Sequence, residues 1–210
     1  MTSSVFASLT GIPVIPVVVI DDPAHAVPVA RALARGGLPV IELTLRTPSA
    51  LDSIKAISAE VPEVLIGAGT VTTPAQANDA VAAGARFLVS PGSTHRLLEA
   101  MIETGVPFLP GVATVGEALE VWERGVTEMK FFPAEAAGGA PFLKSLHGPL
   151  PQLRFCPTGG ITPANASSYL ALPNVACVGG SWLTPAAALA AGDWDAIERL
   201  AREARGSVEA

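Results

Sequence analysis

The 210-residue sequence predicts an α/β fold in which strands and helices alternate and close into a single (β/α)8 barrel. Short continuous apolar runs recur along the chain, and Ala-rich stretches with helical spacing lie between them. Because the runs lack the alternation of a half-exposed strand, we expect strands buried on both faces of a parallel sheet. The eight runs are Val14–Ile20, Val40–Leu45, Val64–Ile66, Phe87–Val89, Val106–Leu109, Met129–Phe132, Phe155–Cys156 and Val175–Val178.

Two signals mark the helix boundaries between these runs. A capping side chain stands directly before a proline, the residue favoured at the first helical position, in Asp22-Pro23, Thr47-Pro48, Thr73-Pro74, Thr162-Pro163 and Thr184-Pro185. Glycines that can end a helix stand just before the next apolar run, at Gly36-Gly37, Gly84, Gly105 and Gly125. Strict alternation with eight strands favours a closed barrel over an open sheet.

We expect one domain over residues 1–210, because no linker or low-complexity tract interrupts the repeat. The chain is shorter than the roughly 250 residues typical of a TIM barrel, so its loops should be brief. Residues 1–11 precede the first run and are predicted to form a short helix across the bottom of the barrel.

Charge and cysteine content narrow the classes of partner. The net charge of -6 offers no basic patch for nucleic acid or an anionic membrane, so neither is an expected partner. Cys156 and Cys177 lie in apolar runs and are too few for a disulfide framework, which predicts buried, reduced thiols. The run Val14–Ile20 follows no Lys or Arg and is too short to span a bilayer, so we expect a cytoplasmic protein.

Lys130 is the most informative residue, because it lies inside the apolar run Met129–Phe132. Active sites of (β/α)8 barrels lie at the C-terminal ends of the strands. An unpaired ammonium is costly to bury, so a lysine directed into the barrel favours the neutral amine, which is the nucleophile of Schiff-base enzymes. A lysine that extends to solvent from the edge of the sheet would explain the same pattern without any chemistry.

Glu42, Thr44 and Arg46 share one face of the second predicted strand, since side chains alternate along a strand with a period of two. If that face looks into the barrel, a carboxylate general base and a guanidinium that can bind a carboxylate stand together. The pattern fits equally well an ion pair between Glu42 and Arg46 that only braces the barrel.

Two glycine-rich turns follow the seventh and eighth predicted strands, at Thr158-Gly-Gly160 and Gly179-Gly-Ser181. Phosphate is frequently held at this position in (β/α)8 barrels. Each turn precedes a predicted helix start, where backbone N–H groups point at an anion, and glycine lets the backbone approach closely. Plain tight turns are the alternative reading.

Several motifs of cofactor-dependent enzymes are missing from the sequence. Gly67-Ala-Gly69 is followed by Thr72 where the dinucleotide-binding pattern needs a glycine, and there is no Walker A or HExxH motif. His25, His95 and His147 are dispersed near the ends of predicted helices, and we expect them at the surface. We therefore expect neither a metal nor a cofactor.

Five segments carry a shared pattern: Glu42-Leu-Thr-Leu-Arg-Thr47, Gly67-Ala-Gly-Thr-Val71, Lys130-Phe-Phe-Pro-Ala-Glu135, Arg154-Phe-Cys-Pro-Thr-Gly-Gly-Ile161 and Gly179-Gly-Ser-Trp182. Together they closely resemble the bacterial KDPG (2-dehydro-3-deoxy-6-phosphogluconate) aldolases, many of which also act on 4-hydroxy-2-oxoglutarate. The resemblance runs from Pro13 to Asp195, nearly the whole chain.

The resemblance implies a class I aldolase that cleaves KDPG reversibly to pyruvate and glyceraldehyde 3-phosphate in the Entner-Doudoroff pathway, with no cofactor and as a homotrimer. It implies that Lys130 forms the Schiff base and that Glu42 is the general acid and base. The implied substrate-binding residues are Arg46 and Thr70 for the carboxylate, Pro91 and Phe132 lining the pocket, Thr158 for positioning, and Gly159, Gly160 and Ser181 for the phosphate.

Three alternatives stay open at this point. The first is an aldolase of the same mechanism that acts mainly on unphosphorylated 4-hydroxy-2-oxoglutarate. The second is a phosphate-binding barrel that catalyses metal- or carboxylate-assisted epimerisation, which needs no covalent adduct. The third is a noncatalytic or engineered scaffold that keeps an aldolase barrel for assembly.

Overall fold

The strands of this computed structural model, which describes residues 4–206, form two parallel sheets. The first has six strands in the order β5-β4-β3-β2-β1-β9, and the second has three in the order β6-β7-β8. Every pairing within them is parallel. The strands are β1 (Val14–Val18), β2 (Val40–Thr44), β3 (Leu65–Gly69), β4 (Leu88–Val89), β5 (Phe108–Leu109), β6 (Gly111–Val112), β7 (Glu128–Phe131), β8 (Arg154–Pro157) and β9 (Val178–Gly180).

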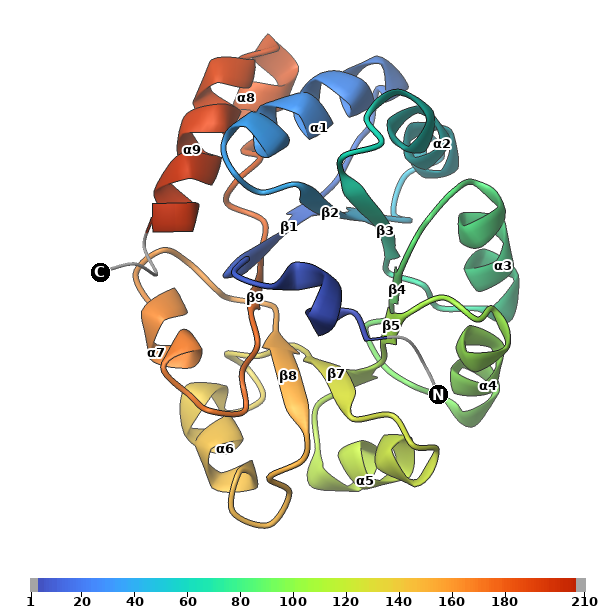
Figure 1. The fold of residues 1–210 in the computed structure, drawn as a ribbon, viewed down its shortest axis with the longest axis vertical. Coiled ribbons are helices and arrows are strands. Elements are labelled where there is room, and N and C mark those ends of the chain that lie inside the picture. Colours follow the sequence, from blue (N-terminus) through green and yellow to red (C-terminus); the bar gives the residue numbers. More distant parts are fainter. Residues whose placement is uncertain (1–3, 207–210) are drawn as a thin grey trace.

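Helices surround the strands on the outside, as Figure 1 shows. Their bounds are η1 (Phe6–Leu9), η2 (Pro23–His25), α1 (Ala26–Arg35), α2 (Ala50–Glu60), α3 (Pro74–Ala82), α4 (His95–Glu103), α5 (Val115–Glu123), α6 (Gly139–Leu146), α7 (Ala166–Leu170), α8 (Ala186–Ala191) and α9 (Trp194–Gly206). Two helices begin with a capping box: α3 at Thr73, which the sequence predicted as a helix start, and α5 at Thr114. The predicted alternation of strand and helix is confirmed.

The strands group as six and three, where the sequence predicted one ladder of eight. One reason is Pro110, which separates β5 from β6 and has no N–H for a ladder. Its carbonyl still accepts from Lys130 N at 3.0 Å, and Gly111 N donates to the buried hydroxyl of Ser90 at 3.1 Å. At the other junction, isolated bridges pair Phe155 with Val175 and Thr158 with Gly179, so β8 lies beside the segment that leads through β9.

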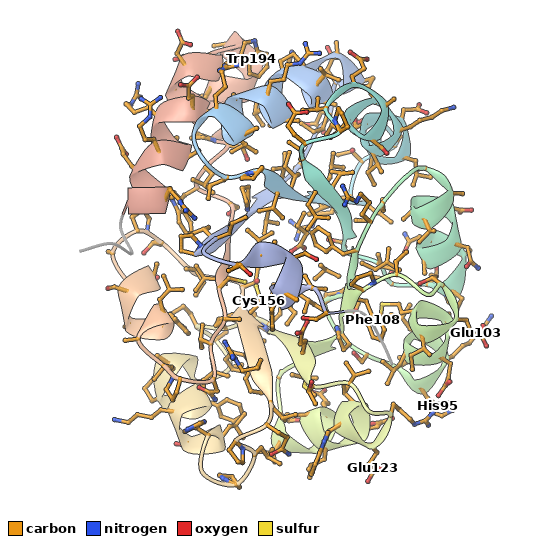
Figure 2. The ribbon with its side chains drawn as sticks, viewed as in Figure 1. His95, Glu103, Phe108, Glu123, Cys156 and Trp194 are labelled. Carbon is orange, nitrogen blue, oxygen red and sulfur yellow. The ribbon has the colours of Figure 1, made fainter. Side chains whose placement is uncertain are left out.

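A small apolar cluster fills the space enclosed by the strands, separate from the larger core between strands and helices. It consists of Val5, Leu9, Ile15, Val40, Phe87, Val89, Leu109, Cys156 and Cys177. Figure 2 shows Cys156 near the centre of the ring of strands. Both cysteines are buried and free, as predicted, and hydrogen bonding to Cys156 together with burial raises the pKa of the Cys177 thiol.

The N-terminal segment crosses one end of this interior cluster (Figure 1). Its helical part is shorter than predicted: a 3-10 turn, Phe6–Leu9, with residues 1–3 outside the described part. The Glu128 carboxylate on β7 accepts from the backbone N–H groups of Val5 at 2.8 Å and Phe6 at 3.2 Å. These bonds satisfy N–H groups that a helix start leaves without partners, and they attach the segment to the sheet.

Within residues 4–206, none of the helices combines the length and the apolar character that crossing a membrane requires. The histidines are only partly as predicted. His95 is exposed at the outer edge of α4 (Figure 2), whereas His25 and His147 are half-buried. Burial of His25 follows from its edge-to-face contact with Trp194, at 5.3 Å between ring centroids.

Candidate active site

Lys130 on β7 and Glu42 on β2 meet across the interior of the molecule. Lys130 Nζ donates to Glu42 Oε1 at 3.0 Å, and the two side chains are only 4% and 2% exposed. The Phe132 ring also faces the ammonium, with its centroid 5.3 Å from Nζ. Lys130 is therefore directed inward, which contradicts the alternative of a lysine extending to solvent.

Because Lys130 and Glu42 are both buried, each charged group is stabilised mainly by the opposite charge of the other. Desolvating a carboxylate or an ammonium costs several kcal/mol, and only a close opposite charge in good geometry offsets that cost. An amine and a carboxylate at hydrogen-bonding distance can also exchange a proton, which yields the neutral, nucleophilic amine. The pair can thus supply both a nucleophile and a general base.

The position of Glu42 depends on a missing side chain on the neighbouring strand. Gly69 pairs with Thr44 at the end of β3. A Cβ at Gly69 would lie 2.3 Å from Glu42 Oε1 and 2.5 Å from its Cγ. The Glu42 carboxylate occupies the space that any other residue at position 69 would fill.

Arg46 and Thr70 form a second polar contact just beyond the ends of β2 and β3. Arg46 Nε donates to Thr70 Oγ1 at 3.2 Å, so Arg46 interacts with Thr70 while Glu42 pairs with Lys130. The predicted alternative of a bracing pair between Glu42 and Arg46 is therefore wrong. Arg46 is exposed, which leaves its guanidinium accessible to an anion.

Thr70 holds a strained backbone conformation. Its φ is 58°, and it is the one non-glycine residue with positive φ in the described part of the chain. A β-branched residue rarely adopts this conformation, which costs on the order of 1–3 kcal/mol and is concentrated at functional sites. The strain turns the Thr70 hydroxyl toward Arg46.

Phe132 faces Lys130, and Pro91 lies against Gly111 on the strand beside it. Gly111 is the register partner of Lys130, and a Cβ at Gly111 would lie 2.3 Å from the Pro91 carbonyl carbon. Phe132 follows β7, and its ring lies 3.2 Å from where a Cβ of Gly159 would stand. Both side chains are half-buried. The aromatic ring thus lies between the lysine and the glycine turn.

The turn Thr158-Gly-Gly160 lies next to the segment that carries Ser181. Thr158 is buried, and its N–H donates to the carbonyl oxygen of Phe131 at 2.9 Å. The two glycines that follow, Gly159 and Gly160, have positive φ angles of 98° and 80°. The bridge from Thr158 to Gly179 places the exposed Ser181 hydroxyl near the turn. Successive N–H groups in such conformations form a concave surface that suits an anion.

The helices after both turns begin later than predicted, at Ala166 for α7 and Ala186 for α8. The turn itself, more than a helix N-terminus, therefore presents the N–H groups. A cavity of about 400 Å³ opens beside Ser181, and its lining includes Asp22, His25 and Thr184. This cavity borders the second glycine turn at Ser181, and its lining does not include the buried pair of Lys130 and Glu42.

Glu135, which follows β7, makes a contact that the sequence pattern does not reveal. Its carboxylate accepts a hydrogen bond from the hydroxyl of Tyr169, the only tyrosine of the chain. Tyr169 is buried, and a buried phenol needs a hydrogen-bond partner. That requirement is a signal, but nothing in the sequence shows which residue supplies the partner.

We predict that Gly69→Ala displaces the Glu42 carboxylate and lowers the free energy of unfolding by about 1–3 kcal/mol, the usual cost of overpacking a core. Gly116→Ala is the matched control, because a Cβ there meets nothing within 4 Å. Chemical denaturation of both variants checks the prediction. A Gly69→Ala protein as stable as the control would contradict the close packing of Glu42 on β3.

Comparison with known proteins agrees with this arrangement. The family model described as KDPG and KHG aldolase matches residues 5–200. The KHG/KDPG aldolase of Escherichia coli K12 is 55% identical over 93% of this chain and 92% of its own length. The 2-dehydro-3-deoxy-phosphogluconate aldolase of Pseudoalteromonas atlantica is 54% identical over 91% and 89%.

Among solved structures, a KDPG aldolase from Legionella pneumophila, with pyruvate captured as a covalent carbinolamine intermediate, has a TM-score of 0.93 and 49% identity. The match covers 96% of this chain and 98% of that one. Sequence and fold therefore agree over nearly the full length, and the chain belongs to the KDPG and KHG aldolase family.

Proposed function

We propose that the chain is a class I aldolase that cleaves KDPG reversibly to pyruvate and glyceraldehyde 3-phosphate, and that it also cleaves 4-hydroxy-2-oxoglutarate. The buried pair of Lys130 and Glu42, 3.0 Å apart, is the observation that carries the proposal. It supplies an amine and a proton acceptor at one enclosed place. The Escherichia coli relative, at 55% identity, is named for both substrates, which supports dual activity, and the Pseudoalteromonas atlantica relative, at 54%, is named for KDPG.

The reaction begins when Glu42 takes a proton from the Lys130 ammonium. The neutral amine attacks the C2 ketone of the substrate to form a carbinolamine. Glu42 gives the proton to the carbinolamine hydroxyl, which leaves as water, so that an iminium and the Glu42 carboxylate remain. Enclosure by Phe132 and the strands disfavours the isolated charges and so favours this proton transfer. No cofactor is needed, because the iminium itself withdraws electrons from the neighbouring bond.

Glu42 then serves in both directions of proton transfer. Directly or through a water, it removes the proton of the C4 hydroxyl, the C3–C4 bond breaks, and its electrons form an enamine with the iminium. Glyceraldehyde 3-phosphate leaves as the aldehyde product. Glu42 returns a proton to C3, and hydrolysis of the resulting iminium releases pyruvate and free Lys130.

Both ends of the substrate carry negative charge, and the residues around the pair match them. Arg46 and Thr70 would bind the carboxylate, with Pro91 and Phe132 lining the space between. Thr158 would orient the substrate, and the N–H groups of Gly159 and Gly160 with the Ser181 hydroxyl would bind the phosphate. The positive φ values of both glycines and the accessibility of Arg46 support these roles.

We also propose that the two sheets act as one closed (β/α)8 barrel in a single cytoplasmic domain that assembles as a homotrimer. The continuity of the chain through Pro110 and the bridges between β8 and the β9 segment support closure. An apolar stripe on the outer face of α5, formed by Val115, Leu119 and Trp122, supports self-association. These side chains are 42%, 38% and 40% exposed.

Covalent trapping tests the Schiff base. After incubation with pyruvate and borohydride, we expect intact mass to increase by one reduced pyruvyl group. Peptide mapping should place it on Lys130 and not on Lys55 or Lys144, the other lysines of the chain. Lys130→Ala should give no adduct, whereas Lys144→Ala should react as the wild type. A folded wild-type protein without an adduct would favour epimerisation or a noncatalytic scaffold.

The Glu42→Gln variant tests the acid–base role of Glu42 separately from Schiff-base formation on Lys130. Loss of the general acid and base should lower kcat by about 10²–10⁴-fold. The amide keeps the shape of the side chain, so trapping of pyruvate on Lys130 should remain detectable. Steady-state kinetics on KDPG checks the first expectation. Wild-type turnover in this variant would refute the assigned role of Glu42.

A mass measurement in solution tests whether the chain is a trimer and whether the apolar stripe on α5 forms its interface. The wild type should have the mass of three chains, and the double variant Leu119→Glu and Trp122→Glu should dissociate, because charged groups cannot be buried unpaired at an interface. Leu51→Glu on α2 is the control, since Leu51 is similarly exposed at 36%. A wild-type assembly far larger than a trimer would instead favour a scaffold.

A further inference from the structure

The loop after Lys130 is attached to the glycine turn by backbone hydrogen bonds. Ala134 N donates to Thr158 O at 2.8 Å, and Glu135 N donates to Gly159 O at 3.1 Å. The stretch that leaves β7 therefore runs alongside the turn proposed to bind phosphate. Any movement of this loop would move both the lysine strand and the turn.

The Glu135 side chain lies directly against that turn. A Cβ at Gly160 would stand 2.6 Å from Glu135 Cγ and 2.7 Å from its Cβ, so the aliphatic stem packs on the glycine. The carboxylate points further on, toward Gly139, whose Cβ would be 3.6 Å from Glu135 Oε1 and 3.4 Å from the Tyr169 hydroxyl. The Cβ and Cγ atoms of Glu135 thus pack on the glycine turn, whereas its carboxylate lies on the side of Gly139 and Tyr169.

Tyr169 on α7 holds this carboxylate in place. Its ring is 1% exposed, and its hydroxyl donates to Glu135 Oε1. Burial, followed by the hydrogen bond and the charge of Glu135, raises the pKa of the Tyr169 phenol. The phenol therefore stays protonated and remains a donor at any pH at which the enzyme would work.

An unrestrained carboxylate at this position would harm phosphate binding in two ways. Glu135 is exposed and its stem lies against Gly160, so a carboxylate that rotated toward the turn would compete with phosphate for the same N–H groups. Its negative charge would also repel the phosphate, and like charges in a partly enclosed site are unfavourable. The distal carboxylate of 4-hydroxy-2-oxoglutarate is attached at C4 and does not extend as far as the phosphate on C6 of KDPG, so this substrate should meet both effects more weakly.

We propose that Tyr169 is a positioning residue whose hydroxyl holds the Glu135 carboxylate away from the glycine turn, so that the pair favours the phosphorylated substrate over the unphosphorylated one. The inference rests on the proposed aldolase function and deepens it. It assigns the choice between KDPG and 4-hydroxy-2-oxoglutarate in part to a contact that touches neither the lysine nor the substrate.

Tyr169→Phe tests the proposal, because it removes only the hydroxyl and keeps the ring in the core. We expect KM for KDPG to rise about tenfold, the effect of losing one hydrogen bond to a charged group. KM for 4-hydroxy-2-oxoglutarate should change by less than about twofold, since its shorter distal carboxylate does not reach the turn as the phosphate does. Ser167→Ala, an exposed change on the same helix, is the control.

A double variant separates charge from simple structural damage. Adding Glu135→Gln to Tyr169→Phe removes the negative charge, and KM for KDPG should return toward the wild-type value. Glu135→Gln alone should resemble the wild type, because its amide oxygen can still accept from Tyr169. Damage to packing would not be repaired by neutralising a carboxylate.

The outcomes distinguish this inference from the aldolase proposal. Equal loss with both substrates, no change with either, or no rescue in the double variant would overturn the positioning role. Borohydride trapping of pyruvate needs no phosphate site, so it should persist in all these variants. Failure of trapping in the wild type would instead overturn the Schiff-base function itself.

Discussion

The enclosed ion pair of Lys130 and Glu42 is the constraint around which the rest of the site is arranged. Two charges removed from water are tolerable only when they lie close together and both remain partnered. Here they come from strands in different sheets, so the pair exists only when the two sheets face each other across the interior. The pair therefore cannot form unless the two sheets have come together.

Small residues make this arrangement possible. Gly69 leaves the space that Glu42 fills, and Gly160 leaves the space that the stem of Glu135 fills. At the same edge, Thr70 accepts a strained backbone conformation to present its hydroxyl to Arg46. The site therefore depends on where side chains are missing as much as on where they are present.

Much of this could be predicted from the sequence, because apolar runs, capping side chains and helix-ending glycines act locally. The buried strands and most helix starts belong to this class, whereas the local pattern left open whether Lys130 points inward or to solvent. What could not be predicted depends on contacts distant in sequence. Period-two alternation grouped Glu42 with Arg46, yet the partner of Glu42 lies 88 residues away. The split at Pro110 and the bond from Tyr169 to Glu135 likewise depend on how the sheets face each other.

The two thiols of the interior cluster have a practical consequence. Cys156 and Cys177 are the only cysteines of the chain, and both are buried, so neither thiol is accessible to reagents in water. The raised pKa of Cys177 further disfavours its thiolate. A cysteine introduced on an outer helix would therefore be the one readily alkylated position. Fluorescent or spin labels could be attached at a chosen point without first removing the native sulfur.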